Sequence, residues 1–133
     1  MKPFHIEIVT PDGLAYNGEV ESLLVRTDTG DVEILANHSD YIAAVDTGRA
    51  RLIIDGQKRF ASVNGGFLSV QNGEAKLVAI TFEFADQIDK ARAKAAKEKA
   101  EEAIKSAQSK NEIDIAKAKL MRAVSRINVS ELK

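Results

Sequence analysis

The chain has 133 residues, 44% of them hydrophobic and 29% charged, with a net charge of −1, a size that suits one ordinary domain or two small ones. It contains no cysteine and two histidines, so we expect no disulfide framework, no thiolate nucleophile and no zinc site. It has neither an apolar run long enough to span a membrane nor an apolar leader, which favours a cytoplasmic protein without a transmembrane helix.

The first eighty residues consist of short apolar runs separated by turn residues. Phe4, Ile6 and Ile8 occupy every second position, which is the period of a half-buried strand. Further apolar runs cover residues 20–25, 34–35, 41–45, 51–54, 60–63, 67–70 and 75–80. Turn residues separate them at 11–13, 28–31, 46–48, 55–56, 64–66 and 72–73. Asp55-Gly56 is a strong hairpin signal, because both central residues of such a turn need positive φ.

Many short strands with turns at a spacing of roughly 8–12 residues predict a sandwich or barrel. No helical period interrupts the strands, which argues against a parallel βαβ fold. We therefore predict an N-terminal antiparallel β-sandwich with Greek-key-like connections, as a domain of residues 1–84.

The composition becomes helical near Ala85, since residues 85–133 contain no Gly or Pro and are rich in Ala, Lys and Glu. Two apolar seams have helical spacing: Ala93, Ala96, Ala100, Ala103 and Ala107, then Ile113, Ala116, Leu120, Ala123 and Ile127. The polar break at 108–111 predicts that two helices fold back on each other, with Ser109 and Glu112 as a capping box or Asn111 as a direct cap. The chain is thus predicted to be α+β, with an antiparallel α-helical hairpin as a second domain of residues 85–133.

Two properties of this hairpin bear on its function. A seam made mostly of Ala buries little apolar area, so we expect a marginal hairpin that can open or dock elsewhere. Residues 1–84 hold 7 Lys and Arg against 12 Asp and Glu, a net charge of −5, whereas residues 85–133 hold 12 against 8, a net charge of +4. This split suggests different partners for the two regions, although charged helices are also merely soluble.

This organisation resembles the epsilon subunits of bacterial F-type ATP synthases, over the whole chain. The turn at 10–13 and the Asn-Gly-Gly-Phe sequence at 64–67 are similar to family turns, and His38 stands where many members have a Gly-His pair. The sequence Ile-Asp-Lys-Ala-Arg-Ala at 88–93 resembles the I/L-D-x-x-R-A motif of bacillus-like epsilon subunits that bind ATP. Residues 30–40 depart from the family pattern by two missing glycines and two missing prolines, so we expect a changed loop on an unchanged fold.

The basic residues of the hairpin suggest an anion site. Arg92 lies three residues after Asp89 on the same helical face, and Lys99 follows two turns later. Arg122 and Arg126 are one turn apart on the second helix, and an antiparallel hairpin brings them alongside the first. Such a cluster suits a triphosphate, while spacing alone favours an exposed Asp-Arg ion pair and a solvated basic face. Acidic residues interleave with the basic ones and no aromatic residue follows 84, which argues against nucleic acid.

The resemblance implies a role for each candidate residue. Glu83, Ile88, Asp89 and Ala93 would hold the adenine of ATP, and Arg92, Arg122 and Arg126 the phosphates, with Lys99 in place of a family arginine. ATP would be a regulatory ligand. We expect no catalytic residue, no metal needed for the fold and no Walker loop, since Gly65-Gly66 precedes Phe.

The resemblance also implies partners and a mechanism. The sandwich would bind the gamma subunit and the ring of membrane c subunits, peripherally at the cytoplasmic face of the cell membrane. The hairpin would inhibit ATP hydrolysis when extended toward the catalytic alpha and beta subunits, and ATP would stabilise its folded, non-inhibitory state. We expect the isolated chain to be a monomer and not an enzyme. Two alternatives stay open: a purely structural rotor subunit whose hairpin ignores nucleotide, and a freestanding adapter protein.

Overall fold

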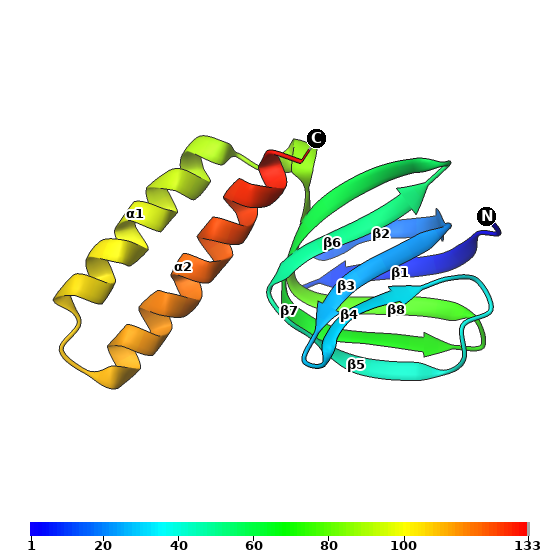
Figure 1. Ribbon diagram of the computed structural model, residues 1–133, viewed down its shortest axis with the longest axis horizontal. Helices are drawn as coiled ribbons and strands as arrows, with labels where there is room; N and C mark the ends of the chain where they lie inside the picture. The colour runs from blue at the N-terminus through cyan, green and yellow to red at the C-terminus, as the bar shows by residue number, and fades with distance from the viewer. Residues whose placement is uncertain (133) are drawn as a thin grey trace.

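The computed structural model describes residues 1–132 and consists of a β-sandwich followed by a helical hairpin (Figure 1). The strands are β1 (Phe4–Thr10), β2 (Gly13–Val20), β3 (Ser22–Thr27), β4 (Gly30–Ile34), β5 (Tyr41–Val45), β6 (Gly48–Ile54), β7 (Gln57–Gln71) and β8 (Glu74–Phe84). A 3₁₀ turn at Ala85–Gln87 leads to α1 (Lys90–Ser106) and α2 (Lys110–Ser130). The predicted fold class is confirmed. No described helix has the length and apolar character needed to cross a membrane.

The strands form one hydrogen-bonded path in the order β2-β1-β8-β7-β5-β3-β4, and β6 joins β3 to β7. The sheet therefore folds over on itself and encloses the core. Neighbouring strands are antiparallel, apart from β1 and β8, which pair in parallel. The large side chains that are completely buried in the core include Ile6, Ile8, Ile34, Leu23, Leu52, Leu68 and Leu77.

Two parts of the sandwich differ from the sequence prediction. Residues 13–20 form β2, although their mixed polar composition gives no apolar strand pattern. This strand is at the edge of the sheet and pairs only with β1, so it needs little apolar surface. Residues 57–71 form the single long strand β7, where two strands and a turn at 64–66 were predicted.

Gly65 and Gly66 bend β7 without ending it. The first half of β7 pairs with β6 and the second half with β5, while β8 runs beside both halves. Gly66 has a φ of +143°, and a Cβ at this position would lie 1.9 Å from the backbone oxygen of Val78. Only glycine permits this approach of β7 to β8, so the residues predicted as a turn instead carry the chain from one layer to the other.

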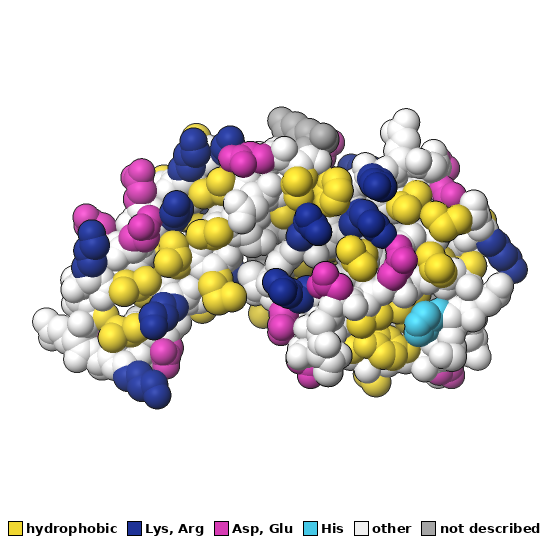
Figure 2. Space-filling model, viewed as in Figure 1, with side chains coloured by type: hydrophobic (Ala, Val, Ile, Leu, Met, Phe, Trp, Pro, Cys, Tyr) yellow, Lys and Arg dark blue, Asp and Glu magenta, His cyan; other side chains and the backbone are white. Residues whose placement is uncertain are grey.

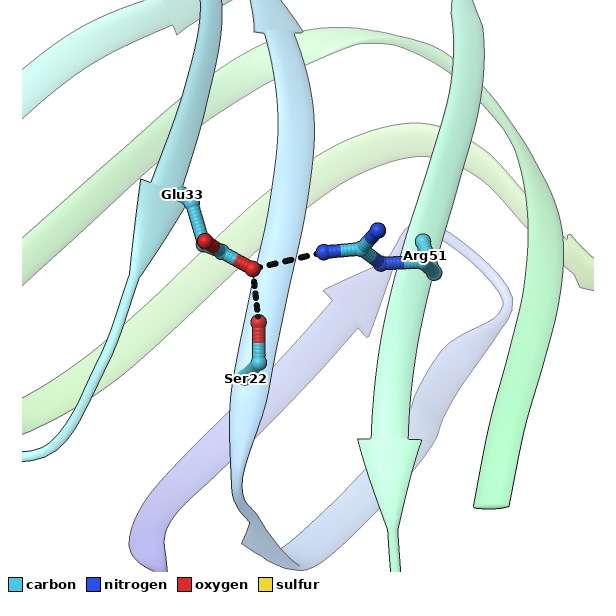
Figure 3. A network of polar contacts seen from close by, with 3 residues as sticks. All are labelled: Ser22, Glu33 and Arg51. Atoms are coloured by element: carbon cyan, nitrogen blue, oxygen red, sulfur yellow. Dashed lines mark hydrogen bonds and ion pairs between the residues drawn. The ribbon is translucent and has the colours of Figure 1, made fainter. Parts of the chain in front are cut away.

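Residues 30–34 of the segment 30–40 form the strand β4, and side chains that differ from the family pattern fix the segment to the rest of the sandwich. Glu33 stands at a family glycine, and its Oε2 accepts hydrogen bonds from Ser22 Oγ at 2.7 Å and Arg51 Nη2 at 2.6 Å (Figure 3). Asn37 stands at the other glycine and takes a φ of 64°, which Asn tolerates better than most residues. Asp40 Oδ1 accepts a hydrogen bond from the backbone N–H of Asn72 at 3.0 Å.

Each helix begins at a side-chain cap. Asp89 caps α1 through a hydrogen bond from the Arg92 backbone N–H to Asp89 Oδ1, at 3.0 Å. Ser109, rather than Asn111, caps α2, and the Glu112 carboxylate accepts a hydrogen bond from the backbone N–H of Gln108. The Ser109–Glu112 prediction is therefore confirmed in its main part.

The seam between the helices agrees with prediction on α2 and differs on α1. Ala116 and Ala123 of α2 are buried, as predicted. On α1, Ala93 and Ala100 are buried, but Ala96 and Ala103 are exposed, while Lys97 and Ile104 are half-buried. The contact face of α1 therefore consists of Ala93, Lys97, Ala100 and Ile104, at spacings of four, three and four. This face is rotated about the helix axis relative to the predicted stripe of alanines.

The hairpin meets the sandwich at one end only. Ser125 of α2 lies with its Oγ 3.2 Å from the Oγ of Ser62 on β7, and Val129 is buried nearby. Within the hairpin, an ion pair joins the start of α1 to the end of α2 at this same end, with Lys90 Nζ 3.0 Å from Glu131 Oε1. The connection between the helices is farthest from the sandwich (Figure 1), so the hairpin is folded back but supported over a short contact.

Candidate functional site

A cleft of about 690 Å³ lies where the hairpin joins the sandwich. The β1–β2 turn and the end of β8 form its sandwich side, and the start of α1 with one residue of α2 forms the other. Six of the eight predicted ATP-site residues line it, namely Glu83, Ile88, Asp89, Arg92, Ala93 and Arg126. Residues far apart in sequence thus meet in one place, which is the main requirement of a binding site.

Asp89 has a structural role in this cleft. Its Oδ1 accepts the cap hydrogen bond of α1, and within residues 1–132 its carboxylate forms no ion pair with the Arg92 side chain. The three-residue spacing of Asp89 and Arg92 is the spacing of an N-cap and the N–H that it binds. Part of the sequence motif is therefore explained by the start of a helix.

Arg126 is the contact between α2 and β8 in the cleft. Its Nε lies 2.7 Å from Oε1 of Glu83, and both side chains are about one-third exposed. Oε1 of Glu83 is buried and receives no well-directed hydrogen bond from the described residues, so the contact is a close ion pair with poor hydrogen-bond geometry. This pair joins the hairpin to the sandwich, and it holds Arg126 at the cleft.

Of the other three predicted basic residues, Arg92 lines the cleft, whereas Lys99 and Arg122 lie outside it. Arg92 is exposed and lines the cleft, and no carboxylate lies in ion-pair contact with it among residues 1–132. Lys99 and Arg122 do not line the cleft. Lys99 is two turns along α1 from Arg92, and Arg122 is one turn before Arg126, so both lie toward the free end of the hairpin.

Apart from Glu83, the residues on the sandwich side of the cleft were not predicted as site residues. Thr10, Asp12, Gly13, Leu14 and Ala15 of the β1–β2 turn line it, together with Thr81 and Phe82 of β8. The turn residues, 10–15, are 75 to 80 positions before Lys90, the first residue of α1. Their proximity arises from the pairing of β1 with β8, which no local pattern reveals.

The chemistry of the cleft is that of binding. The two guanidinium groups of Arg92 and Arg126 suit an anionic group of a ligand, and the apolar side chains suit an apolar part. The carboxylates of Asp12, Glu83 and Asp89 repel an anion, but they can accept hydrogen bonds from amino or hydroxyl groups. Within residues 1–132 no group of three His, Asp or Glu side chains is placed to hold a metal ion.

A second candidate surface is the outer face of β5, β7 and β8. Ile42, Phe67 and Ile80 are 72%, 46% and 59% exposed on these three neighbouring strands. Phe67 pairs with Ala44 on one side and Val78 on the other, which makes the apolar surface continuous across the strands. Exposed apolar faces of this kind mark sites of protein interaction.

Comparison with known proteins places the chain in a family. Residues 3–85 match the model of the ATP synthase delta/epsilon chain β-sandwich domain, and residues 86–131 match that of the delta/epsilon chain long α-helix domain. This chain belongs to the ATP synthase epsilon-chain family. Its members are non-catalytic stalk subunits, so the freestanding adapter is excluded.

Relatives of the epsilon chain match over nearly their full length. The ATP synthase epsilon chain of Bacillus velezensis is 40% identical over 98% of both chains. That of Caldanaerobacter subterraneus subsp. tengcongensis is 37% identical over 97% of this chain and 94% of the relative. The resemblance to bacterial F-type epsilon subunits is therefore confirmed.

Two solved structures share the fold of this epsilon chain. A chain in the Euglena gracilis mitochondrial ATP synthase OSCP/F1/c-ring structure superposes with a TM-score of 0.81 at 18% identity, over 98% of this chain and 82% of that one. A chain in the Tetrahymena thermophila mitochondrial ATP synthase central stalk/c-ring structure has a TM-score of 0.66 at 10% identity, over 95% of both. At these identities the likeness concerns the fold alone.

Proposed function

We propose that this epsilon chain regulates ATP synthase by binding ATP in the cleft between its folded hairpin and its sandwich. The observation that supports this most is that Glu83, Asp89, Arg92 and Arg126, from three separate elements, line one cleft only because the hairpin is folded. An extended hairpin would separate Glu83 from Arg126 and open the cleft.

The residues of the cleft fit the parts of ATP. Arg92 and Arg126 offer guanidinium forks, which suit phosphate oxygens. Asp89 uses Oδ1 as the helix cap, so its second oxygen is left to accept a hydrogen bond from the exocyclic amino group of adenine. Ile88 and Ala93 supply apolar surface for the base. Lys99 and Arg122 would act on the phosphates from farther along the hairpin.

The proposed regulation is a shift of population. Because the site exists only in the folded state, ATP stabilises that state by RT ln(1 + c/Kd), which rises with the ATP concentration c. At low ATP the hairpin extends and its basic surface meets the catalytic alpha and beta subunits, which blocks ATP hydrolysis. Figure 2 shows Lys and Arg side chains spread along the hairpin among acidic ones, a distribution suited to reversible contacts.

The sandwich would provide the attachment to the rotor. We assign the apolar outer face of Ile42, Phe67 and Ile80 to the gamma subunit, since a face of this kind needs a permanent cover. The loop around His38 is the candidate for contact with the c-ring. These two contacts would place the chain peripherally at the cytoplasmic side of the membrane.

Calorimetric titration of the whole chain with ATP, ADP and GTP tests the proposed ligand. We expect ATP to bind more tightly than ADP or GTP. Arg92→Ala should weaken ATP binding at least tenfold without changing the melting temperature of the sandwich, because Arg92 is exposed and makes no ion pair among the described residues. Asp89→Ser keeps an N-cap but loses the carboxylate, and should also weaken ATP binding.

The alternative is that the hairpin is a fixed structural brace. It is favoured by the cap of Asp89 and the Glu83–Arg126 pair, which give the same residues a role without nucleotide. No binding at millimolar ATP would overturn the ATP-gated switch and leave the hairpin as a brace, or as a switch driven by something other than nucleotide.

A further inference from the structure

The β1–β2 turn forms the sandwich side of the cleft together with the end of β8, and the proposed function gives this turn no role. It carries no Lys or Arg, whereas both arginines of the cleft come from the hairpin. Asp12 adds a negative charge to this side. A phosphate chain therefore lies toward the hairpin, and the uncharged part of a bound ligand faces the turn.

The turn is firmly built and presents an apolar side chain. Thr10 Oγ1 accepts a hydrogen bond from the Asp12 backbone N–H at 3.2 Å and donates one to the Gly13 backbone oxygen at 3.3 Å. Within the cleft, Leu14 follows this turn with 57% of its surface exposed.

A bulge directs Leu14 outward. The register shifts between Ile8 and Val9, so that Ile8 pairs with Tyr16 while Val9 pairs with Leu14. Between these two pairs β2 has one residue more than β1. In a regular strand Leu14 would lie on the same, inward face as Tyr16, whereas the bulge places Leu14 beside Val9 on the outer face. A large apolar side chain is thus exposed at a polar cleft, where burial by a ligand would be favourable.

We propose that the β1–β2 turn is a wall of the nucleotide site, with Leu14 as the residue that contacts the base. This rests on the proposed function. Leu14 of the sandwich and Ile88 of the hairpin then supply apolar surface from the two sides of the cleft, and the bound nucleotide bridges the two domains. Bridging explains how the ligand distinguishes folded from extended hairpin, since the extended state lacks the sandwich wall.

The experiment compares two ligands and three variants of the full chain by calorimetry. ATP has base and phosphates, whereas inorganic tripolyphosphate has the phosphates only. Leu14→Ser should weaken ATP binding about fivefold, as expected for loss of a partly buried apolar contact, and leave tripolyphosphate binding unchanged. Leu14→Phe should retain ATP binding. Leu35→Ser is the matched control, because Leu35 is a 44% exposed leucine that does not line the cleft.

The outcomes separate this inference from the function on which it rests. If the unaltered chain binds ATP and Leu14→Ser binds it equally well, the turn is not a wall of the site, while the proposed function stands. Equal weakening of ATP and tripolyphosphate would also overturn the inference, because it indicates a change in the cleft as a whole. If the unaltered chain binds no ATP, the proposed function falls and the inference with it.

Discussion

Single residues decide how two layers of this fold are connected. Gly66 lies where β7 leaves β6 and joins β5, with its backbone against that of Val78 on β8. Gly65 beside it has a φ of +45°, and the nearest atom to its Cβ position is the flexible end of Ile80, at 3.5 Å. The two adjacent glycines are therefore under very different constraints.

Substitution of these glycines tests the constraint. Gly66→Ala should destabilise the sandwich by about 3 kcal/mol, because the added methyl group forces the two strands apart. Gly65→Ala, the control, should cost about 1 kcal/mol for the left-handed conformation alone. Urea denaturation of both variants measures the difference, and equal losses would show that the approach of β7 to β8 is not the cause.

Asp89 shows how one residue serves structure and, in our proposal, function. Its spacing from Arg92 follows from N-cap geometry, so the pattern in the sequence is informative about the helix start even without a ligand. The sequence could locate this pair because both residues belong to one short segment. It could not locate Leu14, whose neighbourhood depends on the pairing of distant strands.

At the scale of elements, the hairpin is the weakly packed part of the molecule. The residues buried on its two helices, apart from the end near the sandwich, are alanines. Alanine contributes little area to a seam, so the helices gain much of their stability from propensity and caps. This fits an element that changes position in our proposed mechanism.

Two matched substitutions test the seam. Ala103→Gly, at an exposed position, should cost about 1 kcal/mol through helix propensity alone. Ala100→Gly, at a position 3% exposed, should cost about 2 kcal/mol because packing is lost as well. Thermal loss of the circular dichroism signal at 222 nm measures both. A larger effect at Ala103 would favour the all-Ala stripe expected from the sequence over the observed contact face.

At the scale of the whole molecule, few contacts hold the hairpin on the sandwich. The Glu83–Arg126 pair and the Ser62–Ser125 contact join α2 to β8 and β7. The Glu83–Arg126 pair, with both side chains about one-third exposed, is worth about 0–1 kcal/mol. The burial of Val129 adds an apolar contact, but the contact is short, so a modest free-energy change is enough to release the hairpin.

Charge reversal at Arg126 tests this balance in the absence of nucleotide. Arg126→Glu places a carboxylate opposite Glu83, which replaces attraction by repulsion, and should broaden the distribution of hairpin positions. Because the chain has no cysteine, spin labels at Asn17→Cys and Ser106→Cys can report the distance between the two domains. Lys117→Glu makes the same charge change at an exposed site of α2 and should leave the distribution unaltered. An unchanged distribution for Arg126→Glu would show that other contacts set the hairpin position.

The sequence by itself determined those features that depend on neighbouring residues: the strand periods, the turns at 55–56 and 72–73, the Ser109 cap of α2 and the composition of the hairpin. Tertiary structure alone decided the edge strand β2, the unbroken course of β7, the rotated face of α1 and the sandwich wall of the cleft. The reason is physical. Local conformation follows from sterics and hydrogen bonds within a few residues, whereas these other features arise when distant strands and helices pack together and exclude water.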